Sequence, residues 1–292
     1  MEPLNHDHQH APNRFAVIPT PVRLNANPEF TGNGVVIAFL ASGFYPHPDL
    51  GSRIIAYHDI AGEQHELSAS GPVESSHWHG TQTSIAAAGN GQLSDGLYRG
   101  VAHESKLVLV KVSQRGRISE ENIARGIRWV IANRERYNIR ILNISLGGDE
   151  DVPCSKSIID RAAEEAISRG IVVVAAAGNS GRRGSTFNSA RQLAVGDHGR
   201  WLFRQQRVEW KSRPLSLEFR RHCDGTVKPE IVAPAMWIAA PILPGTPSYE
   251  QAEALSQLAV APNVDAALQQ QHRRCSLISA QGSKRSREPW DR

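Results

Sequence analysis

The sequence predicts an α/β fold in which a mostly parallel sheet carries helices on both faces and is incomplete at its C-terminal end. Short apolar runs alternate with helical patterns from residue 35 to residue 177. Continuous apolar runs suit strands that are buried on both faces of a parallel sheet. The alternation indicates that helices connect parallel strands. With 292 residues, the chain can form one large domain or two small ones.

The elements follow one another in a regular order. Strands are predicted at 35–40, 107–112, 141–145 and 171–176, and helices at 81–88, 119–138 and 155–169. The second helix places Ile123, Ile127, Val130 and Ile131 on one face. Glycines follow the first and third helices and are expected to end them.

Composition limits the class of protein. Residues 1–28 are predicted to be an irregular lead-in, without the charged start and apolar stretch of a signal peptide. No apolar run approaches the ~20 residues that span a bilayer, so we expect a cytoplasmic protein that does not bind membranes. Three scattered cysteines, Cys154, Cys223 and Cys275, argue against a disulfide framework and against a metal cluster.

Small and polar residues follow the predicted strands. Segment 41–43 follows the first strand, 147–148 the third and 177–181 the fourth, and His79 is expected at the start of the first helix. In open parallel sheets, functional residues lie beyond the carboxyl ends of the strands. The sequence therefore predicts a site where these segments meet.

Five segments, in this order, resemble motifs of the subtilisin-like serine proteases, or subtilases. They are Gly34-Val-Val-Ile-Ala-Phe-Leu-Ala-Ser-Gly43 with His47-Pro-Asp-Leu50, His79-Gly-Thr81, Asn143-Ile-Ser-Leu-Gly147, Ala176-Ala-Gly-Asn-Ser180 and Lys228-Pro-Glu-Ile-Val-Ala-Pro234. The resemblance covers about residues 32–181 and resumes at 224–244. Each segment alone is a weak signal, but five in order at the matching sheet positions are a strong one.

The resemblance implies peptide-bond hydrolysis without a cofactor, on a peptide or protein substrate. A serine nucleophile needs a histidine that accepts its proton, a carboxylate that orients this histidine, and a donor for the oxyanion. By resemblance, His79 is the general base and Asn179 the oxyanion donor. The residues expected to line the substrate pocket are Ser145, Leu146, Gly147, Ala177 and Gly178. Calcium is common in the family, but no cluster of metal ligands is visible in this sequence.

Two of the three catalytic residues are missing. Ala41 stands at the position of the family's aspartate. Asp49 belongs to a different motif, and we interpret it as a loop or cap carboxylate. The nucleophile motif G-T-S is absent. The nearest imitation, Gly245-Thr246-Pro247-Ser248, is interpreted as a surface loop. The sequence thus predicts a subtilase relative that is catalytically inactive.

The remaining segments divide the chain. Residues 29–181 form the predicted subtilisin-like part, 182–223 a foreign-looking Arg-rich segment, 224–271 a remnant of the domain, and 272–292 an aberrant basic tail. Segment 182–222 holds nine arginines and one lysine against three acidic residues. With suitable synonymous codons, residues 189–201 read one base later as P-P-A-S-S-P-S-A-I-T-V-G-G, which resembles the family's sequence after the oxyanion motif. We therefore hypothesise a pair of compensating frameshifts, and expect 182–223 and the tail to pack poorly.

Two alternatives remain at this point. A pseudoprotease could keep a peptide groove and bind without cleaving. The basic segments could bind nucleic acid, but no aromatic-basic platform or binding motif accompanies them, so no nucleic-acid partner is predicted.

Overall fold

The computed structural model describes residues 17–63, 66–68, 73–147, 157–176 and 238–260, with single residues and pairs between 220 and 233. The chain divides into two compact units, Met1–Pro241 and Ile242–Arg292. Of the segments distinguished in the sequence, 182–219 and 261–292 lie outside the described residues.

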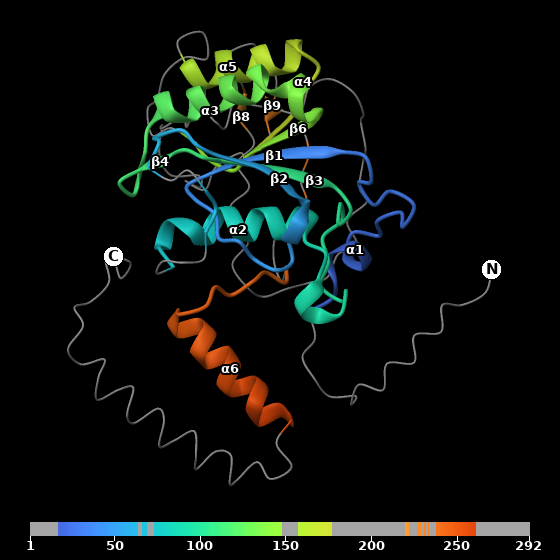
Figure 1. Ribbon diagram of the computed structural model, residues 1–292. Helices are drawn as coiled ribbons and strands as arrows, with labels where there is room; N and C mark the ends of the chain where they lie inside the picture. The colour runs from blue at the N-terminus through green and yellow to red at the C-terminus, as the bar shows by residue number, and fades with distance from the viewer. Residues whose placement is uncertain are drawn as a thin grey trace. The chain divides into compact units, whose positions relative to one another are not determined.

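The first unit contains a five-stranded sheet in the order β2-β3-β1-β6-β7 (Figure 1). Every neighbouring pair in this sheet is parallel. Its strands are β1 (Val36–Ala41), β2 (Ile54–Asp59), β3 (Lys106–Lys111), β6 (Ile139–Ile144) and β7 (Val172–Ala175). The prediction of a mostly parallel sheet is confirmed.

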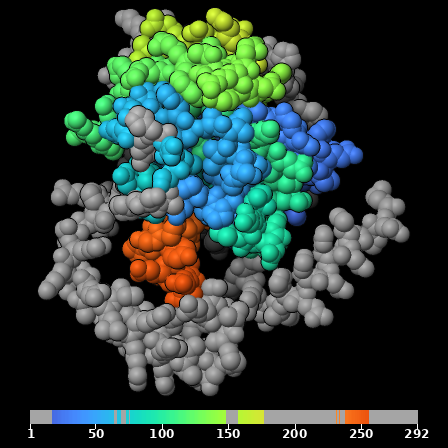
Figure 2. All heavy atoms as spheres, in the orientation of Figure 1, coloured from blue at the N-terminus to red at the C-terminus, as the bar shows by residue number. Residues whose placement is uncertain are grey.

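Both faces of the central strand β1 are buried, because its side chains alternate between two cores. Val36, Ala38 and Leu40 pack with α3 (Glu120–Ala132) and α5 (Ile158–Ser168). Ile37, Phe39 and Ala41 form the other core, with α2 (Ser75–Ala88). Figure 1 shows α3 and α5 above the sheet and α2 below it, and Figure 2 shows the outer side chains of α3 to α5 as a continuous layer. The prediction of helices on both faces is also confirmed.

The remaining elements complete the described structure. They are α1 (Thr20–Arg23), η1 (Gly51–Arg53), η2 (Gln92–Ser94), the hairpin β4 (Ser113–Gln114) and β5 (Arg117–Ile118), α4 (Arg134–Tyr137), the pair β8 (Arg220–Arg221) and β9 (Val227–Lys228), and α6 (Pro247–Val260) in the second unit. None of the helices in the described ranges is both long and apolar enough to cross a membrane.

The first predicted helix was placed too late. It begins at Ser75 rather than at residue 81, so His79 lies within the helix and not at its start. The cause is an unusual cap: the backbone N–H of Glu74 donates to Nδ1 of His77, 3.2 Å away. A histidine takes the place of the Glu or Gln that usually marks this position.

Other boundaries also differ from the prediction. The helix expected at 119–138 is interrupted at Asn133, whose side-chain amide donates to the Trp129 carbonyl (2.9 Å), and it resumes as α4. Strand β2 was not predicted, because it is a half-buried edge strand with no clear alternation. The loop expected at 245–248 is wrong from Pro247 onward: the backbone N–H of Tyr249 donates to Oγ1 of Thr246 (3.2 Å), and α6 begins at Pro247.

A buried carboxyl group lies in the first turn of α5. The Asp160 side chain is buried, and neither of its oxygens accepts a hydrogen bond from a described residue. Burial is the main cause that raises the pKa of Asp160 to about 7; the nearby Ser157 side chain opposes this shift, and the charges of Glu164 and Glu120 add to it. Ionising this group in the folded protein is therefore unfavourable.

We expect Asp160→Asn to remove a loss of stability at alkaline pH. The pKa of Asp160 is higher in the folded than in the unfolded protein, so folding favours its protonated form. The free energy of unfolding is therefore largest at low pH and falls as the pH rises through about 7. Urea unfolding should show the wild type less stable at pH 8 than at pH 5, and the variant should recover on the order of 2 kcal/mol at pH 8. Glu165→Gln, an exposed change on the same helix, is the control. An unchanged pH slope in Asp160→Asn would count against this account.

Candidate functional site

The carboxyl ends of the parallel strands form one row, which we call the carboxyl rim. Asp59, Lys111 and Ala41 are register partners across β2, β3 and β1. On the other side of β1, Leu40 pairs with Ile144, so Ala41 faces the segment that begins at Ser145. The strand ends expected to carry the site therefore meet, as the topology rule requires.

Helix α2 packs closely on this rim, and Gly80 makes that approach possible. A Cβ at Gly80 would lie 2.2 Å from the Gly43 carbonyl oxygen and 2.7 Å from the Cβ of Ala41. Both distances are far below van der Waals contact. Ala41 thus touches the helical turn that carries His79, and the glycine after this histidine is required by packing.

The loop after β1 is fastened to the same turn of α2 by hydrogen bonds. Ser42 Oγ donates to the Ser76 carbonyl (2.6 Å), and the Tyr45 backbone N–H donates to Thr81 Oγ1 (2.8 Å). The Thr81 hydroxyl in turn donates to the His77 carbonyl (2.6 Å). The two residues after His79 are therefore fixed in place, Gly80 by close packing and Thr81 by two hydrogen bonds.

His79 is half-buried, with its ring 6.2 Å from that of Trp78. Burial lowers the pKa of His79, and no carboxylate of the described residues contributes to this shift. The other shifted histidines differ in this respect. Asp49, Asp59 and Glu74 partly offset the effect of burial at His47, His58 and His77, respectively.

A buried ion pair, Lys111 with Asp59, lies beside Ala41 together with the partly exposed Glu63, and the sequence analysis did not predict it. Lys111 Nζ lies 2.9 Å from Asp59 and 3.2 Å from Glu63, and the Lys111 and Asp59 side chains are 5% and 0% exposed. Close by, His77 is buried and its Nε2 has no hydrogen-bond partner among the described residues. The sequence did contain a signal for this pair, since Lys111 ends a buried apolar strand. A buried lysine is almost always paired, so a carboxylate partner could have been expected.

The other predicted site residues are only partly described. Ser145 and Leu146 are half-buried and Gly147 is exposed, just beyond the end of β6. Ser145 Oγ accepts from the amide of Asn143 (2.9 Å). Ala177, Gly178 and Asn179 lie outside the described residues; Ala176, the last one before them, donates its N–H to the Ile144 carbonyl (3.1 Å).

Asp49 is a loop carboxylate that makes structural hydrogen bonds, which agrees with its interpretation from the sequence. Its Oδ1 accepts from the Leu93 backbone N–H (3.0 Å), and its backbone N–H donates to Nδ1 of His47 (3.1 Å). The carboxylate ties two loops together. No group of three or more His, Cys, Asp or Glu side chains suited to a metal ion occurs in the described part of the chain.

Comparison with known proteins gives a consistent family assignment. The sequence profile of the subtilase family matches residues 32–273. Serine protease AprX of Bacillus subtilis (strain 168) is 40% identical over 166 residues, which cover 54% of this chain and 36% of that protein. Subtilisin of Bacillus pumilus is 38% identical over 161 residues, which cover 54% of this chain and 52% of that protein. The match thus spans about a third of the first relative's length and about half of the second's.

Solved structures can also be compared with this chain. A cold adapted subtilisin-like serine proteinase matches 53% of this chain and 50% of its own, with 27% identity and a TM-score of 0.41.

Proposed function

Since this chain belongs to the subtilase family, we propose that it derives from a serine endopeptidase and does not itself hydrolyse peptide bonds. Ala41 takes the position of the catalytic aspartate, His79 that of the general base, and Asn179 that of the oxyanion donor. No residue takes the position of the nucleophilic serine. The substrate of the active ancestor would be a peptide or protein.

The environment of His79 carries this proposal. A catalytic histidine needs a carboxylate that fixes its tautomer and stabilises its cation. At His79, burial lowers the pKa and no described carboxylate opposes this effect. Asp59, the carboxylate at the end of β2 on the carboxyl rim, is paired with Lys111. His79 would therefore be neutral at pH 7, without an orienting carboxylate among the described residues.

A serine-reactive fluorophosphonate probe tests the loss of activity. We expect no labelling of the purified chain and no hydrolysis of casein, because no serine is activated by a histidine. Subtilisin of Bacillus pumilus, treated in parallel, is the positive control. A single labelled serine, lost in the His79→Ala variant, would contradict the proposal.

Peptide binding without cleavage is a second candidate function. It is favoured by the segment beyond the β6 and β7 pair, where Ser145 and Leu146 are half-exposed and Gly147 is exposed. By resemblance, Ala177 and Gly178 would line the same groove. Calorimetric titration with a casein-derived peptide at two temperatures should then show saturable binding, and the absence of heat at both would exclude this function for that class of peptide.

A further inference from the structure

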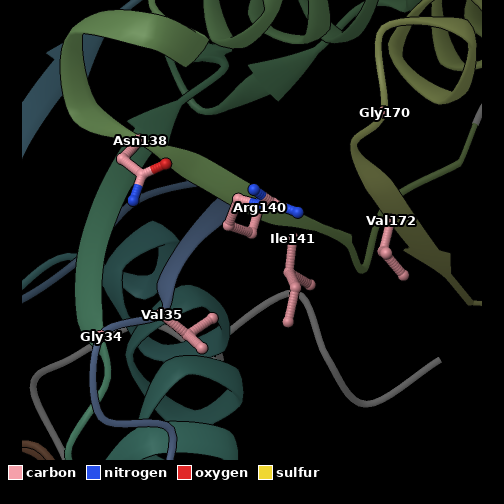
Figure 3. Close-up of a pocket in the computed structure, with 7 residues that line it drawn as sticks. All are labelled: Gly34, Val35, Asn138, Arg140, Ile141, Gly170 and Val172. Atoms are coloured by element: carbon pink, nitrogen blue, oxygen red, sulfur yellow. The ribbon is translucent and has the colours of Figure 1, made fainter.

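The sheet has a cavity at the amino ends of its strands, opposite the carboxyl rim. Its volume is about 430 Å³, within the range of small-molecule sites. It lies at the amino ends of β1, β6 and β7, and no rim residue contributes to it (Figure 3). Its lining residues are Gly34, Val35, Asn138, Arg140, Ile141, Gly170 and Val172.

One part of this lining is apolar and accessible. In Figure 3 the side chains of Val35 and Ile141 point to the same side of the sheet. Val35 and Ile141 are half-buried, and Val172 is 49% exposed. Val35 and Ile141 pack with part of their surface against the core beneath α2, and the rest of their surface, together with Val172, lines the cavity.

The other part of the lining is cationic. Arg140 is exposed, and none of the ion pairs among the described residues involves it. The Arg134 guanidinium is also near, because a Cβ at Gly170 would lie 3.5 Å from its Nη1. Arg134 pairs with Glu135, so Arg140 supplies the uncompensated charge. The amide of Asn138, beside Arg140, adds hydrogen-bond donors.

We propose that this cavity binds a small ligand that joins one carboxylate to an aliphatic chain. The carboxylate would pair with the Arg140 guanidinium, for which a planar two-oxygen anion is the matching partner. The chain would lie on Val35, Ile141 and Val172, and burial of this apolar surface would favour binding. A purely ionic ligand would leave the valines exposed, and a purely apolar one would leave the arginine without an anion.

The test is an NMR titration of the full chain with octanoate, read at the methyl groups of Val35, Ile141 and Val172. Octanamide and acetate are the comparison ligands, since each lacks one of the two required parts. Acetyl-valyl-leucine is a second carboxylate probe: tighter binding than octanoate would assign the site to peptide C-termini, and weaker binding would assign it to acyl chains.

The matched variants are Arg140→Gln, in the cavity, and Arg128→Gln, an exposed arginine on α3 outside it. We expect Arg140→Gln to weaken octanoate binding about tenfold, and Arg128→Gln to leave it unchanged. Both positions are exposed, so both variants should melt as the wild type does. Methyl signals that do not respond, equal binding of octanamide, or equal effects of the two variants would overturn the inference. None of these outcomes depends on the proposed loss of protease activity.

Discussion

Replacing Gly80 by alanine should destabilise this protein by at least about 3 kcal/mol. In an ordinary helix interior the same change would stabilise by roughly 0.5–1 kcal/mol, because alanine is the better helix former. Here the added Cβ would lie 2.2 Å from a backbone oxygen, that of Gly43, and 2.9 Å from Cε1 of Phe44. The helix would have to move away from the carboxyl rim, which opens the core around Ala41.

Urea unfolding measures this effect, with Gln82→Ala on the same helix as the control. Gln82 is half-buried, and its replacement by alanine adds no atom at the interface. We expect the control to change the free energy of unfolding by less than about 0.5 kcal/mol. A Gly80→Ala variant as stable as the control would show that α2 does not pack on β1 as described.

Removing Lys111 should be the other strongly destabilising change. Lys111→Met leaves the carboxylate of Asp59 buried without its ammonium partner, at a cost of about 3–5 kcal/mol. Asp59 would keep the hydrogen bond from the backbone N–H of Ala61 (2.9 Å), which does not compensate for the lost charge. The expected cost therefore comes from a buried carboxylate that has lost its cation rather than from a lost packing contact.

A double-mutant cycle separates these two causes. In Lys111→Met combined with Asp59→Asn, neither charge remains, so the double variant should be clearly more stable than Lys111→Met alone. We expect a coupling free energy of about 2 kcal/mol between the two positions. Additive effects would mean that the pair does not interact in the folded protein.

The sheet could be predicted from the sequence because its central strands have a clear apolar pattern. All six side chains of β1 are buried, as are the four consecutive apolar ones of β3, so each of these strands contains an uninterrupted apolar run. The edge strand β2 is mostly half-buried and ends in polar residues, so no pattern distinguishes it from a loop. Edge position, rather than weak propensity, explains this omission.

At the candidate site, the order of motifs along the chain could be recognised in the sequence, whereas the pairing of distant side chains could not. The glycine and threonine after His79 could be quoted as a motif, but only the structure gives their physical reasons: close packing at Gly80 and two hydrogen bonds at Thr81. The pairing of Lys111 with Asp59 joins residues 52 positions apart, and no local pattern predicts it.

The central claim is that position 41 and His79 belong to one site, from which a carboxylate is missing. The direct measurement is an NMR pH titration of His79 in the wild type, in Ala41→Asp and in Ala41→Asn. Asparagine is the matched control, because it has the shape of aspartate without the charge. We predict a His79 pKa below 6.5 in the wild type and in Ala41→Asn, and a rise of at least about one unit in Ala41→Asp. A His79 pKa that is the same in the aspartate and asparagine variants would contradict the account.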